Sequence, residues 1–126
     1  MVTLKRVFAS FVLLLPLAVQ AVGEPYSRQK LDALNRAGTP VLVAVHADWC
    51  STCRAQDLVL RDLLATHKFD RVTVLRMDYD NQKAAVHALG VRYQSTLIVF
   101  KAGREVARSV AETDPVLIAD LLRNAQ

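Results

Sequence analysis

The sequence has few cysteines and no second metal-binding pair to accompany them. Its 126 residues hold only Cys50 and Cys53, and no other Cys or His pair stands at ligand spacing. A structural zinc site usually has four such ligands, so we expect no resident metal and no cofactor. A disulfide across two intervening residues closes too small a loop to restrict the unfolded chain much, which argues against a structural staple. A redox-active thiol pair is the favoured interpretation, with metal or cluster ligands and an inert pair as alternatives.

The chain also lacks a concentration of positive charge. The formal net charge is +4, and two of the cations, Lys5 and Arg6, belong to an N-terminal leader. The other 14 basic residues are scattered among 12 acidic ones, with no Lys/Arg block and no interleaved aromatic residues. Nucleic-acid binding therefore has little support.

A membrane-spanning run is missing as well, although the leader is apolar. Its apolar stretch covers residues 7–19, is broken by Pro16, and is shorter than the ~20 residues of a spanning helix. Small residues follow and allow cleavage after Ala21 or, less favourably, after Gly23, which is typical of a secretory signal. We therefore expect residues 1–21 to be a signal peptide that directs the protein to the bacterial periplasm; an N-terminal membrane anchor is the alternative.

Residues 22–126 contain no internal repeat, low-complexity tract or long linker, which predicts one domain. Their hydrophobic pattern alternates between helical and strand periods and predicts an α/β fold of order α-β-α-β-α-β-β-α. Ser27 and Asp114 are predicted N-caps, and Asp80 or Asn81 is a third. The predicted helices cover residues 28–37, 51–66, about 81–89 and 115–124, and the predicted strands cover 41–47, 72–77, 96–101 and 104–110.

The two cysteines lie where a predicted buried strand meets the helix that begins at Ser51. The spacing Cys-x-x-Cys places both thiols on the first turn of that helix. Unpaired backbone N–H groups and the positive end of the helix dipole stabilise a thiolate there, which suits Cys50 to nucleophilic attack. Cys53, one turn deeper, is expected to be more buried and to resolve a mixed disulfide.

The chain resembles the thioredoxin superfamily over residues 40–122. The segment ADWCSTCR, with Trp49 directly before the first cysteine, carries the resemblance together with VLRMD at 74–78 and LGVRYQSTLIVFKAGREVA at 89–107. Periplasmic thioredoxins and the C-terminal domain of the electron-transfer reductase DsbD are both similar. The resemblance implies a thioredoxin-like fold with a mixed sheet of about four strands, flanked by helices.

This resemblance also implies an activity, a thiol-disulfide oxidoreductase that reduces protein disulfides or relays electrons. Cys50 would attack a protein disulfide and Cys53 would resolve the mixed disulfide. The implied partners are protein thiols and disulfides and a membrane-bound electron donor. A metal- or iron–sulfur-binding module and a redox-inactive interaction domain are the alternative functions.

One departure from the thioredoxin pattern lies in the loop that would face the cysteines. Thioredoxins carry a proline after a cis peptide bond where this chain has Ser95. By the resemblance, Gln94, Ser95 and Thr96 contact substrate beside Trp49, and loss of the proline changes the shape of this loop. Because the family proline keeps metals away from the thiols, its loss also strengthens the metal-binding alternative.

A second departure lies beneath the cysteines. Thioredoxins have a buried acid and often a buried lysine there, at positions that we match to Ala44 and Val74. Residues two apart share one face of a strand, so His46 is expected on the same side as Ala44 and nearer the thiols. We predict that His46 accepts the proton of Cys53 or tunes Cys50. A packed core histidine is the alternative.

Overall fold

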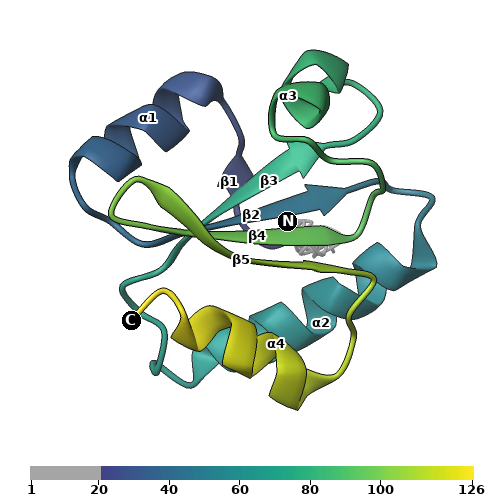
Figure 1. The fold of residues 1–126 in the computed structure, drawn as a ribbon. Helices are drawn as coiled ribbons and strands as arrows, with labels where there is room; N and C mark the ends of the chain where they lie inside the picture. The colour runs from purple at the N-terminus through teal and green to yellow at the C-terminus, as the bar shows by residue number, and fades with distance from the viewer. Residues whose placement is uncertain (1–20) are drawn as a thin grey trace, which may run out of the picture.

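The computed structural model describes residues 21–126, which form a five-stranded mixed sheet covered by helices on both faces (Figure 1). The predicted order of helices and strands is confirmed, but the predicted number of about four strands is wrong. The additional strand has only two residues, too few to show an alternating pattern in the sequence. The elements are β1 (Glu24–Pro25), α1 (Arg28–Arg36), β2 (Val41–His46), α2 (Ser51–Ala65), β3 (Thr73–Asp78), α3 (Lys83–Ala88), β4 (Thr96–Lys101), β5 (Arg104–Val110) and α4 (Pro115–Arg123).

The predicted signal peptide lies almost wholly outside the described residues, which include only Ala21 of it. From that residue to the C-terminus, no helix is both long and apolar enough to cross a membrane.

Strand β2 is the centre of the sheet, whose strand order is β1-β3-β2-β4-β5. It runs parallel to β3 and antiparallel to β4. Five of its six residues are buried, which explains the unbroken apolar run in the sequence. The C-terminal end of β2 leads within a few residues into α2, so this junction is held between a buried strand and a long helix.

Two hydrophobic cores fill the space between the sheet and its helices, with α1 and α3 on one face and α2 and α4 on the other (Figure 1). Side chains alternate between the faces of a strand. Leu42 and Ala44 of β2 therefore join Leu60 of α2 and Ile118 of α4 in one core. The other core takes Val41, Val43 and Val45 of β2.

Two of the three predicted N-cap residues are confirmed. The Ser27 side chain accepts a hydrogen bond from the Lys30 N–H at 3.1 Å, and Asp114 accepts one from Val116 at 2.8 Å. The prediction for α3 is wrong, because this helix begins at Lys83 and its N-cap residue makes no side-chain cap bond. The backbone N–H groups of Asp80 and Asn81 bond instead to the Asp78 carboxylate, which makes a turn before the helix.

Candidate active site

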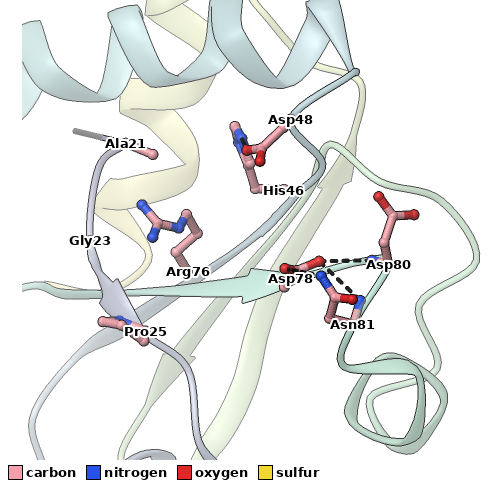
Figure 2. Close-up of a pocket in the computed structure, with 9 residues that line it drawn as sticks. All are labelled: Ala21, Gly23, Pro25, His46, Asp48, Arg76, Asp78, Asp80 and Asn81. Atoms are coloured by element: carbon pink, nitrogen blue, oxygen red, sulfur yellow. Dashed lines mark hydrogen bonds and ion pairs between the residues drawn. The ribbon is translucent and has the colours of Figure 1, made fainter. Parts of the chain in front are cut away.

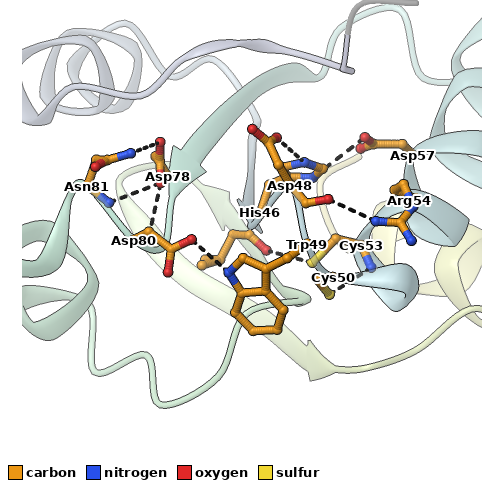
Figure 3. Close-up of polar contacts among 11 residues, drawn as sticks. His46, Asp48, Trp49, Cys50, Cys53, Arg54, Asp57, Asp78, Asp80 and Asn81 are labelled. Carbon is orange, nitrogen blue, oxygen red and sulfur yellow. Dashed lines mark hydrogen bonds and ion pairs between the residues drawn. The ribbon is translucent and has the colours of Figure 1, made fainter.

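The two cysteines lie at the junction of β2 and α2, as predicted (Figure 3). Cys50 is the N-cap residue of α2, and its Sγ accepts a hydrogen bond from the Cys53 N–H at 3.1 Å. Both are free thiols, and Cys50 is 4% exposed while Cys53 is 1% exposed. The backbone donor on Cys50 Sγ stabilises negative charge on that sulfur, which suits it to be the attacking atom.

The Cys53 thiol is held in its protonated form. Its Sγ lies 3.8 Å from the carbonyl oxygen of Val45 on β2. Burial raises the pKa of the Cys53 thiol to about 12, and its hydrogen bond with Cys50 adds to this shift. The backbone of Ala47 and of Ser95 lowers the same pKa, but by less than burial raises it. Cys53 therefore needs a proton acceptor, or a rearrangement around it, before it can attack a mixed disulfide.

His46 lies on the α2 side of the sheet, as predicted, and its imidazole contacts two carboxylates (Figure 3). Its Nε2 is 3.2 Å from Asp48 Oδ1, and its Nδ1 is 3.6 Å from Asp57 Oδ2. Within residues 21–126 it makes no hydrogen bond to either cysteine. Any proton transfer between His46 and Cys53 would therefore pass through water.

A partly buried carboxylate and a cation lie near His46 at positions that the sequence analysis missed. Strand register pairs Ala44 with Arg76 and not with Val74, so a cation does lie beside the Ala44 position. Asp57 of α2 is mostly buried, and burial raises the pKa of its carboxyl while His46, Arg76 and Arg61 oppose that shift. One signal was present in the sequence, since residues four apart share a helix face and Asp57 is four residues after Cys53.

Solvent reaches His46 from two sides. A cavity of about 540 Å³ is lined by His46, Asp48, Arg76 and Asp78, among others (Figure 2). A second cavity of about 520 Å³ is lined by His46, Asp48 and Asp57, among others. Water in either cavity can exchange protons with the His46 imidazole.

The Trp49 side chain is 61% exposed directly beside the cysteines. Its indole N–H donates to Asp80 Oδ2 at 2.8 Å, which ties the loop before α2 to the loop after β3 (Figure 3). This bond fixes the ring while leaving most of its surface free. Trp49 is therefore placed as a docking residue should be, and its contact with substrate stays a prediction.

The loop that carries Ser95 faces the cysteine pair. Within the described residues no peptide bond is cis, so the Gln94–Ser95 bond is trans. Ser95 has a left-handed backbone with φ of 60°, and its N–H donates to the Val45 carbonyl at 2.8 Å. Ser95 and Thr96 are buried and Gln94 is half-buried. Contact with substrate through Ser95 or Thr96 would therefore use backbone atoms.

A metal site is not evident around the cysteines. From Ala21 to Gln126, no group of three or more His, Cys, Asp or Glu side chains is arranged to hold a metal ion.

Comparisons with known proteins agree with this geometry. The thioredoxin family model matches residues 26–123. A thioredoxin of Chlamydia muridarum is 37% identical over 86 residues, which cover 68% of this chain and 82% of that protein. The thioredoxin Asp f 29 of Aspergillus fumigatus is 32% identical over 88 residues, which cover 70% of this chain and 80% of that protein. The crystal structure of Trxlp from Edwardsiella tarda is 41% identical and matches with a TM-score of 0.76 over 80% of this chain and 98% of that one.

Proposed function

This chain belongs to the thioredoxin family, and we propose that it works outside the cytoplasm as a protein-disulfide reductase supplied with electrons by a membrane-bound donor. The family carries thiol-disulfide oxidoreductase activity on protein disulfides through a Cys-x-x-Cys pair. In this chain the pair is Cys50 and Cys53. The observation that supports this role best is their geometry, with one thiol capping the helix and the other buried beneath it.

The reaction takes place in two exchanges. Cys50 Sγ attacks one sulfur of the substrate disulfide and forms a mixed disulfide, while the other substrate sulfur leaves as a thiolate and takes up a proton. Cys53 Sγ then loses its proton and attacks Cys50 Sγ, and the second substrate sulfur leaves in the same way. The substrate gains two electrons and the cysteine pair loses two. A donor must afterwards return two electrons to the Cys50–Cys53 disulfide.

Export is supported by the leader and by the packing of the first residues after it. Val22 packs against the core, and a side chain at Gly23 would meet Val74 at 2.8 Å. Cleavage after Ala21 keeps both residues in the folded domain, whereas cleavage after Gly23 would remove them. A thiol pair in an oxidising compartment is reduced only if a partner brings electrons across the membrane, which is why the proposal includes a membrane-bound donor.

We expect the full chain, expressed in a Gram-negative host, to reach the periplasm with Val22 as its first residue. The measurement is N-terminal sequencing of the protein from separated periplasmic, membrane and cytosolic fractions. A Leu14→Arg variant interrupts the apolar run and should leave uncleaved protein in the cytosol. Uncleaved wild-type protein in the membrane fraction would support an anchor instead, and uncleaved protein in the cytosol would refute export.

The role that we propose for His46 is that of proton acceptor for Cys53. Its ring is fixed by Asp48 and Asp57, is open to water, and follows directly after Val45, whose carbonyl contacts Cys53. The Asp57 carboxylate stabilises the imidazolium that forms when the proton arrives.

Replacing His46 with alanine should slow the resolving step by about tenfold at neutral pH, because a positioned general base is lost. The thiolate absorbance of the reduced protein, followed against pH, should show Cys53 ionising at higher pH than in the wild type. His67→Ala is the matched control, since His67 is exposed and, among residues 21–126, its side chain pairs only with Asp70. Identical curves for His46→Ala and wild type would rule the role out.

A further inference from the structure

Polar residues are rare in the interior of the described domain. Only Gln56, Ser95 and Thr96 are buried among the polar and charged residues from position 21 onward. Gln56 is 3% exposed and is one of three buried residues of α2, with Cys53 and Leu60. A buried amide must find hydrogen-bond partners, so its surroundings show what it holds.

The Gln56 amide fastens α2 to two loops that are distant in the sequence. Its Nε2 donates to the Ser95 carbonyl at 3.0 Å and to the Glu112 carbonyl at 2.9 Å. The Ser95 carbonyl also accepts the Ala111 N–H at 3.0 Å, so the two loops bond to each other as well as to the amide. Both hydrogens of one side-chain amide are therefore used to hold the loop before β4 and the loop after β5.

This fastened loop is the one that touches the buried thiol. The Ser95 N–H donates to the Val45 carbonyl at 2.8 Å, and Cys53 Sγ lies 3.8 Å from the same oxygen. Gln56 is also three residues after Cys53 and thus on the same face of α2. Gln56 is therefore linked to the thiol both along the helix and through the Ser95 loop.

We propose that Gln56 is a positioning residue for the second exchange: its amide fixes the Ser95 loop, whose N–H shares the Val45 carbonyl with Cys53 Sγ, and so keeps that sulfur in place when it attacks Cys50. The proposal rests on the exchange function proposed above and names a residue that sets its rate. In this step the Cys53–Cys50 bond forms, the bond between Cys50 and the substrate sulfur breaks, and the leaving sulfur takes the electron pair.

The electrostatic setting of Cys53 agrees with this role. The Ser95 backbone lowers the pKa of the Cys53 thiol against the larger opposing effect of burial. Titratable groups near Cys53 include Cys50 at the start of α2, Asp57 four residues further along α2, Tyr79 after β3 and His46 of β2, and the remaining charged residues of α2 are Arg54, Arg61 and Asp62. If the loop moved away, the contribution of Ser95 would be lost and only the Ala47 backbone would still oppose the effect of burial on the Cys53 pKa.

The test follows both exchanges with one reagent, the aromatic disulfide dithiobis(nitrobenzoate). Attack by Cys50 releases one coloured thiolate, and attack by Cys53 on the resulting mixed disulfide releases a second. In Gln56→Met, which keeps the volume but removes the donors, we expect the second release to slow by about tenfold and its pH profile to shift to higher pH. The first release should stay within about twofold of wild type.

Leu60→Met is the matched control. Leu60 is also buried, one turn further along α2, but its apolar side chain cannot hydrogen-bond to either loop. It should leave both releases unchanged. An unchanged second release in Gln56→Met, or equal slowing in the two variants, would overturn the proposal. If Gln56→Met does not fold, Gln56→Leu serves the same comparison. A wild-type protein that releases only one thiolate would instead refute the exchange function.

Discussion

Replacing Cys50 with serine is expected to abolish disulfide reduction, with the rate of insulin reduction falling at least about a thousandfold, as when other essential nucleophiles are removed. A serine hydroxyl at the start of α2 is too weakly acidic to attack a disulfide at neutral pH. The measurement is the turbidity that develops when insulin chains separate, with dithiothreitol as the electron source.

Cys53→Ser is the informative companion to this variant. It keeps the attacking thiol but cannot complete the second exchange, so it should accumulate a mixed disulfide with insulin that is visible on a non-reducing gel. Cys50→Ser should form no such adduct. Insulin reduction at the wild-type rate by Cys50→Ser would contradict the account, and a wild-type protein that does not reduce insulin at all would favour a redox-inactive interaction domain.

Leu60→Ala is expected to lower the free energy of unfolding by about 2–5 kcal/mol, the usual cost of leaving a cavity in a packed core. Leu60 of α2 is 0% exposed and packs in the core that α2 and α4 form with the sheet. Since a typical domain has only about 5–15 kcal/mol of stability, this one change removes a large share of it. Urea unfolding followed by circular dichroism measures the effect.

The same helix provides the control for this prediction. Leu58 is 59% exposed, and Leu58→Ala should change the free energy of unfolding by no more than about 0.5 kcal/mol. Because alanine is at least as good a helix former as leucine, equal losses in the two variants would show that burial of Leu60 does not account for its effect on stability.

The elements whose signals are local were predicted best. Strands β4 and β5 have the bounds predicted from the sequence, because two strand-forming runs flank the dipeptide Ala102-Gly103. Both turn residues have positive φ, 51° and 77°, which is the backbone of the two-residue turns that suit a hairpin. Strand β1 was not predicted because its two residues form a strand only by pairing with β3, which lies far along the chain. No local sequence pattern reveals such a pairing.

The candidate site divides in the same way. Cys50, Cys53 and Trp49 stand in one short segment, and the start of a helix next to a buried strand was enough to place the thiols. Gln56 and Arg76 act across elements, so their roles depend on which loop α2 reaches and on how β2 and β3 align. Neither relation can be read from the spacing of residues along the chain.

Asp57 shows how a contact between two elements changes the site. The strand position matched to the family acid holds Ala44, yet a partly buried carboxylate lies nearby because Asp57 projects from α2 toward His46. A carboxylate and a cation are therefore both present near the site, but the carboxylate comes from Asp57 of α2 and the cation from Arg76 of β3. The proton path that we propose for Cys53 depends on this arrangement.

The central claim is that Cys50 and Cys53 form a reversible redox pair, and a redox titration tests it most directly. Metal-free protein is equilibrated with mixtures of reduced and oxidised glutathione, its free thiols are alkylated, and its mass is measured. The account predicts one reversible two-electron transition between the dithiol and an intramolecular Cys50–Cys53 disulfide, absent in Cys53→Ser. A pair that forms no intramolecular disulfide at any ratio of the two glutathiones would contradict it.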